Sequence, residues 1–392
     1  MKKILSAIII VFFSAIITSC ANNNGPSFGG DMYGPIIFGD KWEENKLDSL
    51  TCVAFSDIQY YYNWEELVHY ESGMFNYYNE LYPLYTNNLI KVSFKNKIYA
   101  EITLLDESGN EVYTVIPDAE GHCYLFPQWK ANQYQISVKY WDKNTGNEVI
   151  EQHFVSNNIV LNIDGLENKR ENIDIMFVVD TTASMNDEIE FLKNEIKKVV
   201  EEVTSENTAS IRVAILLYKD VNELYKTLYS DFTSNIDDQV EFLANKIAYG
   251  GGDYEEAVAD AMEEAVNKDW TLKNSTNILV HFADAPCRDE EITDWYNASL
   301  ELNKKGIRTI SVASSGINKK TEYLMRSMTL ITNGTYVYLT NDSRIGDEHM
   351  DATVDFDFVV EYLDECLIRL INGYQTGIME RPKDIYKTIK TR

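Results

Sequence analysis

The chain has 392 residues, and its 62 acidic and 35 basic side chains give it a formal net charge of −27 at pH 7. This length corresponds to about two domains, which is enough for a real hydrophobic core. With 45% hydrophobic and 25% charged residues, the composition is that of globular proteins and excludes the disordered, collagen-like and coiled-coil classes. The negative charge repels phosphate backbones, so we expect no nucleic acid partner and instead divalent cations or basic protein surfaces.

The first 30 residues predict export and anchoring. Two lysines precede an apolar run that ends at residue 17. At about 14 residues, this run is too short to span a bilayer of about 30 Å as a helix, but it matches the apolar region of a secretory signal. Residues 17–20, Ile-Thr-Ser-Cys, resemble a bacterial lipobox. The resemblance implies a lipoprotein signal peptide over 1–19 and a diacylated Cys20 that anchors the chain in the bacterial cell envelope.

The expected anchor is in the outer membrane, facing the periplasm or the surface, and an ordinary signal peptide with an incidental cysteine is the alternative. Residues 20–30, with Asn, Gly and Pro and little to bury, predict a flexible tether.

Four further cysteines follow, at positions 52, 123, 287 and 366. Export would place them in a compartment that permits disulfides. No CxxC pair is present, so a zinc or thioredoxin-type site has no support. Cys52 and Cys123 could form a bridge within the first half of the chain, but buried free thiols fit the spacing equally well.

Two segments of different character precede the second half of the chain. Residues 31–87 are rich in aromatic side chains, which predicts packing against a neighbouring domain, with an aromatic platform for sugars as the alternative. Residues 88–168 contain short alternating runs separated by turn signals, which predict a small β-sandwich. Its strands are expected at 90–94, 98–104, 112–116, 134–140, 149–154 and 159–163. The stretch from residue 101 to 127 resembles the Ig-like or carboxypeptidase-regulatory-like modules of bacterial surface proteins, which implies a spacer or accessory role.

Residues 170–375 alternate strands with amphipathic helices, and 376–392 form a C-terminal tail. The expected strands are 173–179, 211–218, 225–232, 277–283, 307–313 and 335–339, and the expected helices are 184–203, 236–247, 254–267, 289–305, 319–332 and 353–372. This order predicts an α/β fold with a doubly wound, mostly parallel sheet. In such sheets, ligands bind outside the carboxyl ends of the strands.

Oxygen-bearing side chains gather at these strand ends. Asp180, Thr182 and Ser184 follow the first strand at i, i+2 and i+4, and all three are hard ligands of the kind that magnesium requires. Asp253 follows three glycines, and Asp284 ends a buried strand. A structural alternative is that Ser184 caps the next helix and Asp180 is a turn residue.

This pattern resembles the metal-ion-dependent adhesion site of the von Willebrand factor type A family, whose signature is D-x-S-x-S. Asp180, Thr182 and Ser184 match the signature, Asp253 matches the glycine-rich loop position and Asp284 the strand-end position. The resemblance covers 170–375. It implies that Mg²⁺, or Mn²⁺ or Ca²⁺, binds here, with the two hydroxyls as direct ligands and some carboxylates acting through water.

The chain departs from the adhesive members at Asp253, where those members usually carry a neutral threonine. A third carboxylate would make the site negative overall and would weaken its attraction for an acidic partner residue. The alternative is that Asp253 lies outside the set of direct ligands or caps its helix.

Catalytic interpretations have weaker support. The triple glycine is not followed by the Lys-Ser/Thr of a phosphate-binding loop. A phosphatase with Asp180 as nucleophile needs a second carboxylate at position 182, which is a threonine. A thiol nucleophile at Cys287 would need His281, which lies on an apolar strand and is better explained as a core residue.

We therefore expect a binding protein, not an enzyme. The partner would be a protein that donates a carboxylate or another oxygen to the bound metal. The alternative is a structural or scaffolding module of an envelope complex, in which the metal site is vestigial or only stabilising.

Overall fold

The computed structural model describes residues 49–69, 73–82, 84–354, 356–383 and 385–389. The predicted signal peptide, the tether, Cys20 and the first part of the aromatic segment lie outside these residues. Among the described helices, none combines the length and the apolar character needed to cross a membrane.

A nine-stranded sheet forms the centre of the larger part of the molecule, in the order β11-β10-β9-β12-β13-β14-β1-β15-β16. Strands β10, β9, β12, β13 and β14 run parallel to one another, and β11 is antiparallel to β10. The six strands are β9 Asn172–Asp180, β10 Ser210–Tyr218, β11 Thr227–Thr233, β12 Ser275–Ala283, β13 Ile307–Ala313 and β14 Thr335–Leu339. The central ones are apolar and buried along nearly their whole length, as expected for strands that are covered on both faces. The predicted α/β fold with a mostly parallel sheet is confirmed.

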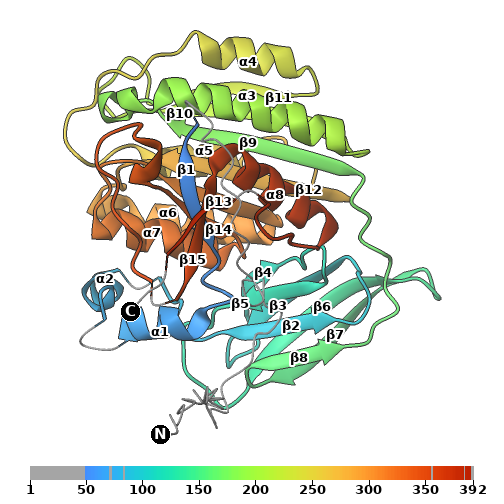
Figure 1. Ribbon diagram of the computed structural model, residues 1–392. Helices are drawn as coiled ribbons and strands as arrows, with labels where there is room; N and C mark the ends of the chain where they lie inside the picture. The colour runs from blue at the N-terminus through green and yellow to red at the C-terminus, as the bar shows by residue number, and fades with distance from the viewer. Residues whose placement is uncertain (1–48, 70–72, 83, 355, 384, 390–392) are drawn as a thin grey trace, which may run out of the picture.

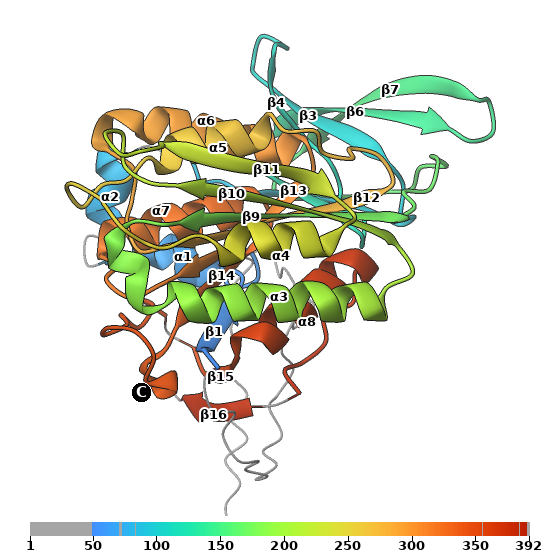
Figure 2. The same cartoon turned by 90° about the horizontal axis from the view of Figure 1, so that it is seen from above.

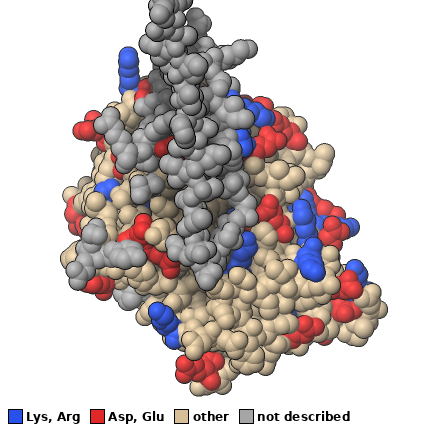
Figure 3. All heavy atoms as spheres, turned by 60° about the horizontal axis from the view of Figure 1, so that its bottom comes forward, with Lys and Arg blue, Asp and Glu red and all other residues tan. Residues whose placement is uncertain are grey.

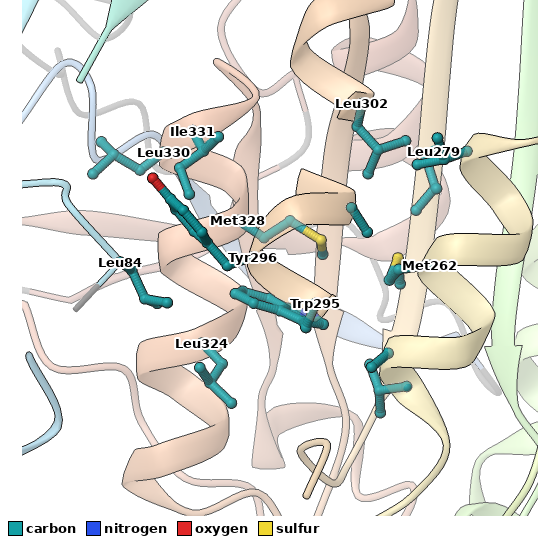
Figure 4. Packing of buried hydrophobic residues seen from close by; sticks show 14 of the residues in the cluster. Leu84, Met262, Leu279, Trp295, Tyr296, Leu302, Leu324, Met328, Leu330 and Ile331 are labelled. Atoms are coloured by element: carbon teal, nitrogen blue, oxygen red, sulfur yellow. The ribbon is translucent and has the colours of Figure 1, made fainter. Parts of the chain in front are cut away.

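Helices cover both faces of this sheet (Figure 2). One face packs against α3 Ile189–Glu206, α4 Ile236–Ala244 and α8 Leu363–Thr376, and the other against α5 Val258–Val266, α6 Ile292–Lys304 and α7 Lys319–Ile331. On the second face, Trp295 and Tyr296 of α6 pack in one buried cluster with Met262 of α5 and Met328 of α7 (Figure 4). Three short 3₁₀ helices complete this part, at Ala183–Asp187, Asp289–Glu291 and Asn341–Ser343.

Strands from both ends of the chain extend the sheet beyond β14. Strand β1, Thr51–Phe55, is antiparallel to β14 on one side and to β15, Phe358–Tyr362, on the other, and β16, Ile385–Ile389, follows at the edge. The sequence predicted one helix over 353–372, but α8 begins only at Leu363. The residues before it form β15, because the β-branched pair Val359 and Val360 adds to the sheet.

The aromatic residues after β1 pack against α7. They belong to α1, Tyr61–His69, and to the approach to α2, Asn76–Leu81. The indole of Trp64 stacks on the ring of Tyr323 with 6.0 Å between ring centres, and Phe75 lies 5.6 Å from the same ring. The aromatic segment therefore forms part of the core on this face of the sheet.

Residues 90–161 form two small sheets that share one core (Figure 1). One has the order β5-β2-β8, with β2 Ile90–Phe94, β5 His122–Leu125 and β8 Asn158–Leu161. The other has the order β4-β3-β6-β7, with β3 Ala100–Leu105, β4 Glu111–Val115, β6 Tyr134–Asp142 and β7 Asn147–Val155. Strand β5 was not predicted, because its four residues are too few to show an alternating pattern.

All four described cysteines are buried free thiols. Cys52 lies in β1 and Cys123 in β5, in two different hydrophobic cores, so the bridge considered from the spacing does not form. The thiol of Cys52 instead lies within hydrogen-bond range of Cys366 on α8.

Candidate metal centre

The predicted site lies at the carboxyl ends of two neighbouring parallel strands. Asp180 is the last residue of β9, and Asp284 directly follows β12, which pairs with β9 in parallel register. The strand order reverses here, since β10 lies on one side of β9 and β12 on the other. This is the position at which open α/β sheets bind ligands.

The loop after β9 holds its first two predicted ligands together. Oδ1 of Asp180 accepts hydrogen bonds from the Thr182 amide at 2.9 Å and from the Thr182 hydroxyl at 2.7 Å. The hydroxyls of Thr182 and Ser184 are 3.1 Å apart. Oδ2 of Asp180 is buried and has no hydrogen-bond partner that meets the usual geometry. The nearby hydroxyl of Tyr218 lowers the pKa of this carboxyl group. One carboxylate oxygen is thus left for a ligand.

Asp284 joins this group from β12. Its side chain is buried, and Oδ1 has no hydrogen-bond partner among the described residues. Burial, together with the charge of Asp180 and against a hydrogen bond with Ser184, raises the pKa of Asp284 to about 7. Burial likewise raises the pKa of Asp180 to about 6, against the hydrogen bonds from Thr182. The two carboxylates therefore repel each other in a poorly solvated place.

A third buried carboxyl group, Glu256, completes the cluster. Burial, together with the charges of Asp180, Asp220 and Asp284, raises its pKa to about 9. Its Oε2 has no hydrogen-bond partner among the described residues. The Glu256 amide donates to the carbonyl of Pro286 at 3.0 Å, which fixes it beside the loop that carries Asp284.

The glycine-rich loop brings Glu256 close to Thr182. Gly251 has φ +95°, and a Cβ placed on it would lie 3.3 Å from Oε1 of Glu256 and 3.4 Å from Cβ of Thr182. The absence of a side chain there lets the loop pass between these two residues. The Ala183 amide also donates to the carbonyl of Gly250 at 2.9 Å, which ties the loop to the segment after β9.

Asp253 lies apart from this cluster. Its side chain is 64% exposed, and Oδ1 pairs with Nη2 of Arg288 at 3.2 Å. Arg288 also pairs with the buried Asp220. Because α5 begins at Val258, with Ala257 at the N-cap position, Asp253 does not cap that helix either.

The structure thus brings together Asp180, Thr182, Ser184 and Asp284, and the acid of the glycine-rich loop that is buried beside them is Glu256, whereas Asp253 is exposed. A signal for this was present in the sequence. Glu256 directly precedes the apolar start of the helix, Ala257 to Ala259, so its position is the more buried of the two.

The donor set suits a hard cation. No group of three or more His, Cys, Asp or Glu side chains in the described part of the chain is arranged to hold a metal. The cluster instead combines two hydroxyls with carboxylates, and its unpartnered buried oxygens are those of Asp180, Asp284 and Glu256. Oxygen ligands of this kind, supplemented by water, fit magnesium and not zinc. The residues present therefore fit the predicted ion.

The nearby residues considered for catalysis lack the required properties. Burial lowers the pKa of His281 to about 3, so its imidazole is neutral, and Nε2 lies 3.1 Å from the hydroxyl of Tyr218. Burial raises the pKa of Cys287 to about 12, so the group is a thiol and not the reactive thiolate.

The loop after β14 closes one side of the site. His349 lies 2.7 Å from Oε1 of the buried Glu188, and the Ser315 amide donates to the same oxygen at 3.0 Å. The charge of Glu188 contributes to the raised pKa of Asp284. The candidate centre is therefore enclosed by acidic groups from several loops.

Comparison with known proteins agrees with this fold. Residues 174–343 match the family model of the von Willebrand factor A domain. The observed mostly parallel sheet with helices on both faces is consistent with this match.

Two curated proteins are similar to the chain. The alpha-protein kinase vwkA of Dictyostelium discoideum is 26% identical over 169 residues, and an ariadne-like RING finger protein of Acanthamoeba polyphaga mimivirus is 27% identical over 193 residues. The matches cover 43% and 44% of this chain but only 27% and 19% of the two relatives.

Similar solved structures come from two Bacteroides species. BatB from Bacteroides thetaiotaomicron is 14% identical, with a TM-score of 0.33, over 44% of this chain and 93% of that chain. An aerotolerance-related membrane protein from Bacteroides fragilis is 13% identical, with a TM-score of 0.35, over 52% of this chain and 99% of that chain.

Proposed function

We propose that the chain is a lipid-anchored envelope protein that binds a protein partner through a divalent metal ion. The observation that carries this proposal is the cluster of buried carboxyl oxygens without hydrogen bonds beside two hydroxyls, at the carboxyl ends of β9 and β12. Burying a charged carboxylate oxygen without a hydrogen bond or a counter-ion costs free energy, and a bound cation removes this cost.

Asp180, Thr182, Ser184 and Asp284 would hold Mg²⁺, or Mn²⁺ or Ca²⁺, and the nearby carboxylate of Glu256 would add to the attraction for the ion. When bound, the ion supplies a positive centre that an oxygen of the partner can approach. Ser184 is the exposed member of the group, which places the open side of the site at this loop. Asp253 and Arg288 form an ion pair outside the buried cluster, where a partner would contact them.

The anchor in this proposal is the lipid on Cys20. The resemblance of residues 17–20 to a lipobox supports it, and the bacterial cell envelope, with the outer membrane as the expected membrane, follows from it.

A capture experiment with the full mature chain tests the proposal. Immobilised wild-type protein should retain an envelope protein in Mg²⁺ and release it in EDTA, and Asp180→Asn protein should retain nothing. If Mg²⁺ raises the unfolding temperature but no partner is captured under any condition, the stabilising role of the metal in a structural module is the better account.

A further inference from the structure

A second cavity lies where three parts of the molecule meet, away from the candidate metal centre. It measures about 380 Å³ and is lined by residues of the β5-β2-β8 sheet, of the amino end of β13 and of the carboxyl end of α8. Arg308, the second residue of β13, is in its wall, whereas Asp284 follows the opposite end of the neighbouring strand β12. Cavities of this size at the junction of two domains are common sites for small ligands.

Two cationic side chains in this cavity, Arg308 and Lys91, have N–H donors that are not used in hydrogen bonds to described residues. Nε of Arg308 donates to the carbonyl of Asn333 at 2.7 Å, and the guanidinium lies 3.8 Å from the ring centre of Tyr374. Neither Nη group of Arg308 makes a hydrogen bond to a described residue. Lys91 of β2 is half-buried, lies 5.8 Å from the ring centre of Tyr124, and forms no ion pair within the described ranges.

The two acidic residues of the cavity, Asp118 and Glu120, already contact other groups of the chain. Oδ1 of Asp118 accepts from the amides of Glu120 and His122, both at 2.9 Å, and Oδ2 accepts from Nδ2 of Asn333 at 3.0 Å. Glu120 lies 3.6 Å from Nδ1 of His122 and is half exposed. The charges of both carboxylates act on Lys91, whereas the donors left without an acceptor in the described residues are the two Nη groups of Arg308.

A third cationic side chain, Arg170, lies next to this cavity. Arg170 is largely buried in an adjoining small cavity that shares Asp118, Arg308 and Tyr374 with the first. Its Nη1 donates to the carbonyl of Ser275 at 2.7 Å, and its Nε is buried without a partner among the described residues. In a chain with a net charge of −27, positive groups that converge on one enclosed space favour an anion there.

We propose that this cavity binds a small organic anion, whose carboxylate or phosphate group pairs with Arg308 and Lys91. The rings of Tyr124 and Tyr374 flank the two cations, and Ile378 and Met379 provide an apolar wall for the body of the ligand. Because the wall combines the β-sandwich with the α/β domain, the bound anion joins the two.

The test is calorimetric titration of the full mature chain with sodium phosphate and with sodium succinate, each against sodium chloride of equal ionic strength. One of the two anions should bind with a stoichiometry of one. Arg308→Gln should lower its affinity at least about tenfold, because a charged, two-pronged hydrogen-bond donor is lost. Arg308→Lys, which keeps the charge but not the fork, should give an intermediate affinity, and Lys91→Gln should also weaken binding.

Lys95→Gln is the matched control, because Lys95 is an exposed lysine directly after β2 and does not line the cavity. Its affinity should equal that of wild type, as should that of Asp180→Asn, which alters only the metal centre. Thermal melts without ligand show whether each variant is folded. Absence of binding of both anions to wild type, or equal binding to folded Arg308→Gln protein, would overturn the proposal.

Discussion

Asp180, Asp284 and Glu256 each have a buried carboxylate oxygen without a hydrogen-bond partner among the described residues. The pKa of each is raised, and the three groups lie close enough for their charges to act on one another. Carboxyl groups that are close together and poorly solvated disfavour one another's charged form. A divalent ion reverses this, since it stabilises the ionised form of every one of them. We therefore expect metal binding and stability of this chain to be linked.

The Asp180→Asn substitution tests this link directly. The amide oxygen can still accept the hydrogen bonds from Thr182, but one negative charge is removed. We expect Mg²⁺ affinity to fall at least about tenfold, because a charged ligand is lost, while the unfolding midpoint in EDTA does not fall. Calorimetry and thermal melts measure the two quantities. Unchanged affinity would show that Asp180 is not a ligand.

Glu256 and Asp253 can be separated by a matched pair of substitutions, Glu256→Gln and Asp253→Asn. Each removes one carboxylate from the same loop. Glu256→Gln should lower Mg²⁺ affinity markedly, whereas Asp253→Asn should only loosen an exposed ion pair with Arg288, worth less than about 1 kcal/mol. If Asp253→Asn lowers Mg²⁺ affinity more than Glu256→Gln does, Asp253 and not Glu256 is the acid of this loop that acts on the ion.

His281 predicts a pH dependence of stability. Its pKa is lowered by burial to about 3, so the folded chain keeps the imidazole neutral while the unfolded chain takes up a proton below about pH 6.5. The free energy of unfolding should therefore fall as the pH drops from about 6.5 towards 3.

Between pH 7 and 5 this contribution amounts to about 2 kcal/mol. Urea unfolding of wild type and His281→Gln at both pH values isolates it, because the variant lacks the titrating group. His69→Gln, at the exposed end of α1, is the control and should behave as wild type. Equal pH slopes for wild type and His281→Gln would contradict the prediction.

At the scale of elements, α7 is fastened to the N-terminal segment by a fully buried ion pair. Arg326 donates from Nη2 and Nε to the two carboxylate oxygens of Asp57, at 2.6 and 2.9 Å, and from Nη1 to Glu322 at 3.0 Å. Lys319 pairs with the other oxygen of Glu322 at 2.8 Å. The aromatic rings of Trp64 and Phe75 also surround the guanidinium.

Replacing Arg326 by methionine should lower the free energy of unfolding by about 3–5 kcal/mol, because it leaves the carboxylate of Asp57 buried and unpaired. The double variant Asp57→Asn/Arg326→Met should recover part of this loss, since the charge without a partner is gone. Urea unfolding of the two variants checks this. A loss of less than about 1 kcal/mol for Arg326→Met would mean that the pair does not hold the segment.

The elements also show what sequence alone can predict. The strands at 173–179 and 307–313 were predicted nearly to the residue, because long apolar runs between helices have few alternatives. The sequence analysis included the residues of β15 in a predicted helix. It missed the strand because β15 pairs with β1, which is more than 300 residues away in the sequence, and a local pattern cannot show such a contact. The loop position of Asp253 was misplaced for a similar reason, since only the fold shows which acid after the glycines is buried.

The whole molecule carries its charge in a dispersed form. On the face shown in Figure 3, acidic and basic side chains lie in small separate groups and not in one large patch. Removal of residues 1–19, which contain two lysines and no acidic residue, would change the net charge from −27 to −29. This net charge disfavours electrostatic attraction of the chain as a whole to anionic lipids.

The proposed lipid anchor on Cys20 is tested by the Cys20→Ser substitution. This variant should move from the membrane fraction to the soluble fraction of the cell, because the acyl chains are lost. Fractionation and immunoblotting of both proteins measure the change. The Cys123→Ser variant, which removes a buried thiol that carries no lipid, should stay with the membrane. Membrane retention of the Cys20→Ser variant would refute lipid attachment as the sole anchor.

Strand β1 gives the molecule a particular response to mechanical force. It is held in antiparallel register to β14 over four residue pairs and to β15 over two. Hydrogen bonds in such ladders run across the strand direction. A pull on the N-terminal end of β1, along the strand, therefore loads these bonds together in shear and does not open them one after another. The resistance of β1 to such a pull is therefore set by its whole ladder with β14 and β15 and not by its outermost hydrogen bond.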